Sequence, residues 1–251
     1  MKVLSLGWGV QSFTLAAMCA LGEFEKPDVA IHADTLHERS QTYIFAKRMT
    51  PWLEAHGVKV VTVKNPTGGF NKIAESQVFI PAYTLSERGD EGKLMRTCTQ
   101  RWKIAPVRSW LQEHRNGERV EQWMGISTDE AYRMTESKVK YIINAYPLID
   151  LGMSRNDCKA WLAAHDIETP PRSSCTFCPF HSSAEWHDVK NVQADWEEAI
   201  EIENRISKRR PNYTLYLHKE LKPLDQIDFR TEQEKGQLTL WDEECEGLCG
   251  V

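Results

Sequence analysis

The sequence predicts an α/β protein with an open, mostly parallel twisted sheet and helices on both faces. A small C-terminal helical subdomain that carries cysteines is expected to follow it. Two observations predict this fold class. Short apolar runs alternate with longer segments of helical periodicity. The first apolar run opens into a loop with two glycines and two serines, and a helix start follows directly.

The expected elements follow one another in the order that parallel pairing requires. Strands are expected at 2–6, 28–33, 58–63 and 120–125, and helices at 11–21, 40–56, 70–76, 103–115, 154–165 and 194–209. Ser154 and Asp157 form the capping pair of the helix that starts there. Apolar residues at helical spacing define the last helix. The segment 80–97, with Gly89 and Gly92 among mixed charges, is expected to be a loop.

Length and composition set the outer bounds. With 251 residues, 41% of them hydrophobic, the chain can bury the core of one domain with an appendage, and we expect domains at 1–171 and 172–251. The net charge of −5 gives no support for indiscriminate nucleic-acid binding. No stretch approaches the roughly 20 apolar residues of a membrane span, and a strand from Lys2 leaves no room for a signal peptide. We therefore expect a cytoplasmic protein with no membrane partner, whose seven cysteines are metal ligands, catalytic thiols or core residues.

The loop between the first strand and the first helix predicts an anion site. Its sequence is Ser5-Leu6-Gly7-Trp8-Gly9-Val10-Gln11-Ser12. A helix N-terminus directs several backbone N–H groups and a positive dipole end at one spot, which suits phosphate. Gly7 and Gly9 are expected to permit positive φ and close approach, while Ser5 and Ser12 supply hydroxyls. The loop has neither the Walker ending nor the Gly-x-Gly-x-x-Gly pattern, so a tight turn without a ligand is the alternative.

The second strand and its continuation strengthen the prediction of a nucleotide site. It ends in Asp34-Thr35, and Glu38 and Thr42-Tyr43 follow. Together with the loop, this stretch resembles the PP-loop superfamily of adenine nucleotide α-hydrolases, which includes ATP pyrophosphatases and PAPS reductases. The resemblance implies a Rossmann-like fold whose nucleotide, ATP or PAPS/APS, contacts Ser5, Leu6, Gly7, Gly9, Gln11, Ser12, Asp34 and Thr35. Gln11 stands where the ATP pyrophosphatases carry an aspartate that helps to hold magnesium, so magnesium is an open question.

The cysteines predict a metal centre. Cys175-Thr176-Phe177-Cys178-Pro179 lets two thiols reach one metal from a tight turn, although one such pair is half a site. The segment around Cys98 resembles the one in iron–sulfur APS reductases, which implies a [4Fe-4S] cluster on Cys98, Cys175 and Cys178. Threonines flank Cys98, so one ligand is missing. Cys245 or Cys249 could supply it, one iron could lack cysteine, zinc could bind with His181, or the thiols could be bare. Cys19 and Cys158 fall in predicted helices and are expected in the core.

Two groups of charged residues are candidates for contacts to the nucleotide. Arg96, Arg101 and Lys103 lie around Cys98; they are either a solvated face or, as the resemblance favours, a grip on phosphate or sulfate in which Lys103 is catalytic. Residues 125–133 resemble the family's Gly-x-x-x-x-Glu-x-x-Arg segment. By that resemblance Arg133 contacts phosphate and Glu130 orients it. The alternative is a helix start whose acidic residues complement the dipole.

Two reactions fit these residues. In the first, an acceptor attacks the α-phosphate of ATP, pyrophosphate leaves, and sulfur is transferred at an iron–sulfur site. In the second, a thiolate attacks the sulfur of PAPS or APS; the tail Glu244-Cys245-Glu246-Gly247-Leu248-Cys249 resembles the end of PAPS reductases, with Cys245 as nucleophile, but lacks their final histidine.

The whole chain most resembles PAPS reductase-like proteins of phage and, distantly, the iron–sulfur subunit of DNA phosphorothioation. The resemblance favours ATP α-phosphate cleavage and implies a nucleic-acid or small-molecule sulfur acceptor and a thioredoxin-like electron donor. A non-catalytic nucleotide sensor with structural zinc is the third hypothesis. The oligomeric state is not indicated.

Overall fold

The chain folds into two compact units, and each unit is built from two separate segments of the sequence. The computed structural model describes residues 1–67 and 80–230. The first unit comprises Met1–Pro66 and Gln100–Ser173, and the second comprises Thr67–Thr99 and Ser174–Val251. The sequence analysis expected two contiguous domains that meet between residues 171 and 172. The chain passes from the first unit to the second after Ser173, and the second unit also contains the internal segment Thr67–Thr99.

The first unit is a doubly wound α/β fold, as the sequence predicts. Its sheet has the order β3-β2-β1-β6-β7, and every neighbouring pair is parallel. The strands are β1 (Lys2–Ser5), β2 (Val29–Asp34), β3 (Val60–Lys64), β6 (Val120–Met124) and β7 (Ile142–Ala145). The helical elements are α1 (Val10–Leu21), α2 (Ser40–Ala55), η2 (Thr99–Ile104, which reaches the segment boundary), α4 (Ala105–His114), η3 (Thr128–Arg133), α5 (Pro147–Asp150) and α6 (Arg155–Ala164).

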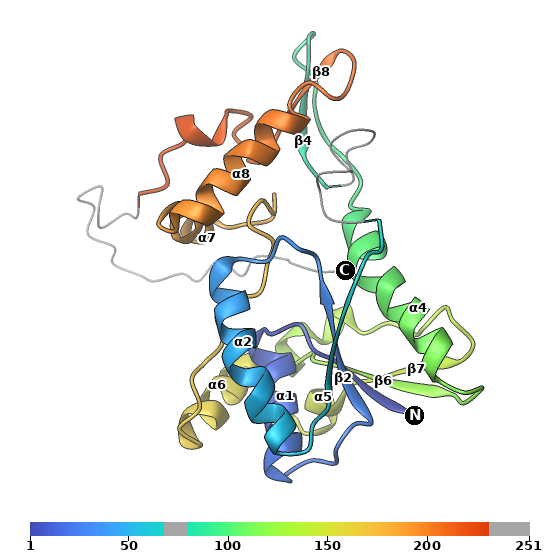
Figure 1. Cartoon of the computed structure of the whole chain (residues 1–251). Coiled ribbons are helices and arrows are strands. Elements are labelled where there is room, and N and C mark those ends of the chain that lie inside the picture. Colours follow the sequence, from blue (N-terminus) through green and yellow to red (C-terminus); the bar gives the residue numbers. More distant parts are fainter. Residues whose placement is uncertain (68–79, 231–251) are drawn as a thin grey trace. The chain divides into compact units, whose positions relative to one another are not determined.

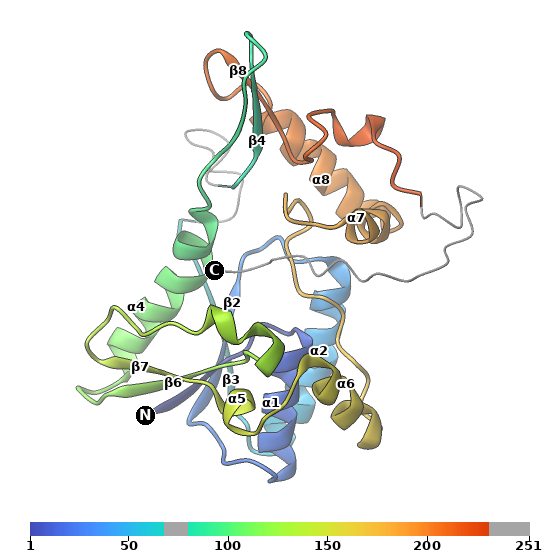
Figure 2. The same cartoon turned by 180° about the vertical axis from the view of Figure 1, so that it is seen from behind.

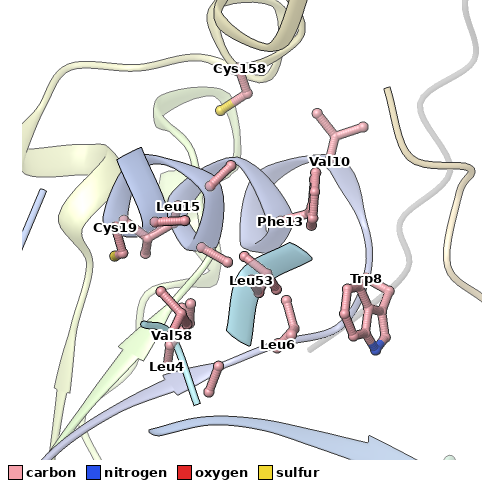
Figure 3. Packing of buried hydrophobic residues seen from close by; sticks show 14 of the residues in the cluster. Leu4, Leu6, Trp8, Val10, Phe13, Leu15, Cys19, Leu53, Val58 and Cys158 are labelled. Atoms are coloured by element: carbon pink, nitrogen blue, oxygen red, sulfur yellow. The ribbon is translucent and has the colours of Figure 1, made fainter. Parts of the chain in front are cut away.

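Helices cover both faces of this sheet (Figure 1), and Figure 2 shows α4 on the face opposite α1, α2 and α6. Side-chain alternation along the strands explains the two layers. Leu4 and Ala30 belong to the core under α1, whereas Val3 and Ile31 belong to the core under α4. Figure 3 shows the first of these cores, with α1 between Cys158 on one side and the strand residue Leu4 on the other.

The capping pair predicted at Ser154 is confirmed. The Asp157 N–H donates to Ser154 Oγ at 3.1 Å, and the Ser154 N–H donates to Asp157 Oδ2 at 2.8 Å. A second box of the same kind, formed by Ser182 and Glu185, begins α7. Both helices therefore have side-chain acceptors for N–H groups that the first turn leaves without partners.

Three helices of the first unit end in the same local motif, Trp-Leu-x-x-His. The histidine Nδ1 lies 2.8 Å from the carbonyl oxygen of the tryptophan one turn earlier in each case, and the two rings pack against each other. The pairs are Trp52 and His56, Trp110 and His114, and Trp161 and His165. The imidazole thus accounts for one of the carbonyl groups that a helix C-terminus exposes.

The second unit contains a sheet that the sequence analysis did not predict. The expectation of a loop at 80–97 is wrong, because β4 (Tyr83–Ser86) and β5 (Glu91–Lys93) form a hairpin there. β8 (Tyr213–Tyr216) completes the antiparallel order β5-β4-β8. The strands are short, and β4 finds its second partner only far along the chain. The helix expected at 70–76 lies outside the described residues.

Helices and one buried carboxylate organise the rest of the second unit. The helical elements are α7 (Ser183–Lys190), α8 (Gln193–Ile206), which confirms the amphipathic helix predicted there, and η4 (Leu224–Gln226). Glu203 of α8 accepts hydrogen bonds from the Leu217 N–H at 3.0 Å and the Leu224 N–H at 2.7 Å. Across the described residues, no helix combines the length and the apolar character that crossing a membrane requires.

Candidate functional site

The N-terminus of α1 differs from the capped helix starts of α6 and α7. Its N-cap is Gly9, which makes no side-chain capping hydrogen bond, and its first turn holds no acidic residue. The first backbone bond of the helix runs from the Phe13 N–H to the Gly9 carbonyl at 3.0 Å. The N–H groups of Val10, Gln11 and Ser12 precede that bond, so they keep their donor capacity at the positive end of the helix dipole.

The loop before α1 holds its shape through Ser12 and Trp8. The Gly7 N–H donates to Ser12 Oγ at 3.1 Å, and that hydroxyl donates to the Gly9 carbonyl at 3.3 Å. The expectation of positive φ at Gly7 and Gly9 is wrong: the left-handed residue is Trp8, with φ of 59°. Its ring is 1% exposed and packs against Phe13 and Phe45, so core packing sustains the unfavourable backbone.

Gly125 brings the end of β6 directly against this loop. A Cβ atom placed on Gly125 would lie 2.6 Å from both the Cα and the N of Ser12. By contrast, Cβ atoms on Gly7 and Gly9 would find their nearest neighbours at 3.7 Å and 3.9 Å. A Cβ atom at Gly9 would therefore make only an ordinary van der Waals contact, whereas Gly125 cannot accept a Cβ atom without a shift of the backbone.

One polar network links the loop to η3. Gln11 Nε2 donates to Glu130 Oε2 at 3.0 Å and to Ser127 Oγ at 3.3 Å. Arg133 donates to the same Glu130 oxygen at 2.7 Å. The structure thus brings together Gln11, Glu130 and Arg133, which the sequence analysis assigned to one site from separate segments. It did not identify Ser127, which is fully buried.

A neighbour of this network serves the fold. Asp129 accepts a hydrogen bond from the Arg155 N–H at 2.9 Å, at the first residue of α6. Burial acts to raise the pKa of Asp129, but hydrogen bonds from the Ser127 hydroxyl and the Arg155 N–H outweigh it and lower that pKa. The alternative of an acidic helix-start residue therefore fits Asp129, while Glu130 faces Gln11.

A second polar network surrounds Glu38 beyond the end of β2. The Glu38 side chain is 1% exposed and lies 3.1 Å from Lys103 Nζ. The hydroxyls of Thr35 and Ser173 donate to its two oxygens, each at 3.3 Å. Ser173 is also the nearest neighbour of the Gly9 Cβ position, which puts this network beside the start of α1. The sequence analysis missed Ser173 because it belongs to no recognisable motif.

Asp34 stabilises the local turn after β2. Its Oδ1 accepts hydrogen bonds from the Leu36 N–H at 2.8 Å and from the Tyr43 hydroxyl at 2.7 Å. Burial and then the hydrogen bond to Asp34 raise the pKa of Tyr43. Leu36 adopts φ of 65°, so the loops after β1 and β2 each contain a non-glycine residue in the left-handed region. Such strain gathers at functional loops, and here it marks the ends of two neighbouring strands.

Three other residues of the predicted nucleotide set have additional contacts. The Ser5 hydroxyl accepts a hydrogen bond from Gln122 Nε2 at 2.8 Å, so β6 helps to fix the end of β1. The Arg101 side chain is exposed, and its carbonyl oxygen accepts a hydrogen bond from Asn65 Nδ2 at 2.9 Å. Arg96 belongs to the second unit, where its guanidinium lies 5.4 Å from the centre of the Phe180 ring. Within the first unit, the structure therefore places Lys103 in the network beside the α1 start.

The predicted metal ligands lie in the second unit. Cys175 and Cys178 form a turn in which the Cys178 N–H donates to the Cys175 carbonyl at 3.1 Å. Within residues 1–67 and 80–230, no three His, Cys, Asp or Glu side chains are placed to hold one metal ion. Cys245 and Cys249 lie outside the described residues, so the full predicted ligand set is not represented in them. The metal set stays a prediction.

The core assignment of the two helical cysteines is confirmed. Cys19 and Cys158 belong to the apolar cluster around α1 (Figure 3). Burial raises the pKa of the Cys19 thiol to about 12 and that of Cys158 to about 11. Neither thiol is therefore suited to act as a thiolate near neutral pH.

Comparisons with known proteins concern families, curated sequences and solved structures. No family model matches the sequence, and no curated protein matches it. Among solved structures, the chain is similar to a crystal structure of phosphoadenylyl-sulfate (PAPS) reductase from Candida auris in a phosphate complex, with a TM-score of 0.49 and 15% identity. The match covers 67% of this chain and 74% of that chain. At this identity and TM-score, the similarity carries no argument about the chain.

Proposed function

We propose that the first unit binds the phosphates of an adenine nucleotide at the N-terminus of α1, as part of a PAPS reductase-like enzyme of sulfur chemistry. One observation carries this proposal: α1 begins without a side-chain cap between two polar networks that each hold a cationic side chain. Backbone N–H groups at a helix start together with Lys and Arg form a standard anion-binding arrangement.

The two cations are positioned by carboxylates without being buried by them. Arg133 and its partner Glu130 are each about a quarter exposed, and Lys103 is 41% exposed although Glu38 is fully buried. Each cationic side chain is thus anchored by a carboxylate and still partly exposed to solvent. A phosphate group at the α1 start would be held by the helix N–H groups, with Lys103 and Arg133 as the proposed counter-charges.

ATP is the nucleotide we favour, and its α-phosphorus is the proposed reacting centre. A nucleophile on the acceptor forms a bond to that phosphorus, the bond to the bridging oxygen breaks, and pyrophosphate leaves with the bonding electrons. Arg133 and the N–H groups of Val10, Gln11 and Ser12 would offset the charge that gathers on the phosphate oxygens. Lys103 would neutralise the departing pyrophosphate, with magnesium as a candidate second counter-charge.

A [4Fe-4S] cluster or zinc in the second unit is a separate part of the proposal. Cys175 and Cys178 provide a turn that could hold one metal with two thiolates. Since no three donors among the described residues are placed to hold one metal ion, we derive no reaction step through the turn. A cluster would supply sulfur or electrons to the activated acceptor.

Product analysis tests the proposed reaction. Protein purified without oxygen is incubated separately with ATP, PAPS and APS in the presence of a dithiol as electron donor, and pyrophosphate and sulfite are measured. Pyrophosphate from ATP supports the proposal, sulfite from PAPS or APS identifies sulfonucleotide reduction with Cys245 as the candidate nucleophile, and binding without turnover identifies a nucleotide sensor. Absence of nucleotide binding contradicts all three.

A matched pair of variants connects the product to the site. Arg133→Gln should lower the rate of product formation by about a hundredfold, because a cation beside the reacting phosphate is lost. Arg48→Gln removes the same charge from an exposed ion pair with Glu168 in the same unit and should leave the rate unchanged. Equal rates in the two variants would show that Arg133 does not take part in the reaction.

A further inference from the structure

His32 connects the interior of β2 to the loop that precedes α1. The sheet pairing of β1 with β2 ends where the Leu6 N–H donates to the Ile31 carbonyl at 2.9 Å. The next contact is made by a side chain, since His32 Nδ1 lies 3.1 Å from the Leu6 carbonyl oxygen. The imidazole therefore extends the pairing by one residue, at the point where the backbone of β1 turns away towards Gly7.

The His32 ring is enclosed by the same loop. It is 6% exposed and packs edge-on against Trp8, with ring centres 6.2 Å apart. Trp8 is the left-handed residue that turns the chain from Leu6 towards the α1 start. His32 thus touches the loop at two successive points, one by hydrogen bond and one by packing.

The hydrogen bond defines the tautomer of His32. A carbonyl oxygen only accepts, so Nδ1 must carry the proton. Burial lowers the pKa of His32 and favours the neutral ring. The charged groups that act on the ring are Glu38 and Asp34, which oppose this shift, and Lys103, which adds to it.

We infer that His32 is a positioning residue for the anion site, which holds the loop of residues 5–12 in its binding conformation by donating its Nδ1 proton to the Leu6 carbonyl. This inference rests on the proposed function for its ligand. The contacts of His32 with the loop are made to Leu6 and Trp8, and it acts on the α1 start through them. When the loop already has its binding conformation, less free energy is lost to ordering it as phosphate binds, and the affinity is higher.

Amide side chains of two lengths distinguish this role from simple packing. The shorter amide, in His32→Asn, would place its N–H donor near the position of Nδ1, whereas His32→Gln places its donor near Nε2, and His32→Phe keeps a ring without a donor. We expect His32→Asn to bind ATP with a Kd within about threefold of the wild-type value. The Gln and Phe variants should lose about tenfold or more. Thermal unfolding of each variant shows whether the fold is kept.

Calorimetry with ATP and with adenosine provides the readout. Adenosine lacks phosphates, so its affinity should stay the same in all variants that fold. The affinity for ATP should be kept in His32→Asn and reduced in His32→Gln and His32→Phe. A uniform loss for ATP in the Asn, Gln and Phe variants, or a loss that affects adenosine equally, would overturn the inference. Either result would assign His32 to packing.

A second measurement separates this inference from the proposed function. If the wild-type protein binds neither ATP nor PAPS, the proposed function fails, and amide hydrogen exchange of residues 7–12 then tests His32 alone. Exchange should accelerate in the Gln and Phe variants and not in the Asn variant. Equal exchange in all variants would show that the loop does not depend on the Nδ1 donor.

Discussion

Gly125 and Ser12 are packed backbone against backbone: a Cβ atom on Gly125 would lie 2.6 Å from the Cα and the N of Ser12. This contact sets the distance between the end of β6 and the start of α1, and therefore places the η3 residues beside the loop. Neither backbone can yield easily, because Ser12 is in the first turn of α1 and Gly125 directly follows a strand.

Gly125→Ala should destabilise the first unit by about 1–3 kcal/mol, the usual range for overpacking. Gly7→Ala is the matched control, because its Cβ would meet Ser12 Oγ at an ordinary 3.7 Å. Denaturant unfolding of both variants measures the difference. Equal stabilities would show that the two segments separate without cost.

The sequence predicted which residues gather at the α1 start because their signals are local. Strand, loop and helix start are contiguous, and Gln11, Glu130 and Arg133 each lie in a segment with a recognisable pattern. Ser127 and Ser173 were missed because a hydroxyl gains its role only when tertiary packing brings a partner to it. The left-handed backbone at Trp8 was missed because steric preference assigns that conformation to the adjacent glycines, and only burial of the indole explains the exception.

The second unit was predicted less well for a topological reason. β4 pairs with β8 through Thr84 and Leu215, and no local pattern reveals a partner so distant in the sequence. By contrast, α8 was predicted because its apolar stripe repeats within the helix itself. The Ser182 cap was overlooked, although its pattern is the one that identified Ser154.

Leu36→Gly should keep the free energy of unfolding within about 1 kcal/mol of the wild-type value. A left-handed backbone costs a non-glycine residue about 1–2 kcal/mol, and glycine returns part of that through its flexible unfolded state. Leu36 is 39% exposed, so the packing that its side chain loses also offsets the relieved strain. Trp8→Gly is the contrasting variant: it relieves the same strain but removes a buried ring and should destabilise by about 3–5 kcal/mol. A loss of stability for Leu36→Gly as large as that of Trp8→Gly would contradict this account.

The pair of His165 and Glu23 should make stability depend on pH. His165 Nε2 lies 2.7 Å from Glu23 Oε1, and the His165 pKa is raised by its bond to the Trp161 carbonyl and by Glu23. The stability that charged His165 contributes is fully present below pH 6.5, the pKa of the unfolded state. It is lost as the pH rises through the raised pKa of the folded state. Hydrogen bonds from Trp161 and then His165 lower the Glu23 pKa, so its contribution is complete above 4.5 and is lost as pH falls through the lowered value.

The two dependences overlap between pH 4.5 and 6.5, where the pair contributes most. His165→Gln should therefore lower the melting temperature most at about pH 5.5 and less at about pH 8.5. His114→Gln is the control, since it removes the same ring contact with a preceding tryptophan at another helix end. A His165→Gln effect that grows with pH would have the wrong sign and would reject this electrostatic assignment.

Cys175→Ser should remove most of the metal if the thiol turn is a ligand site, because a lost thiolate opens the coordination sphere. Cys158→Ala is the matched control, since that thiol is buried in the α1 core. Iron and zinc contents and the visible absorption spectrum of anaerobically purified protein give the comparison. Equal metal contents in wild type and Cys175→Ser would reject the predicted centre, and a loss caused by Cys98→Ser would add Cys98 to it.

Binding of adenine nucleotides to a Gly9→Val variant tests the central claim most directly. A Cβ on Gly9 has its nearest neighbour, Ser173 Cβ, at 3.9 Å, so the variant should fold while its side chain occupies the space at the uncapped α1 start. Calorimetry with ATP, PAPS and APS should show binding by the wild-type protein and at least a hundredfold loss in the variant, about 2.7 kcal/mol. Unchanged affinity of a folded Gly9→Val variant for all three nucleotides would contradict the account.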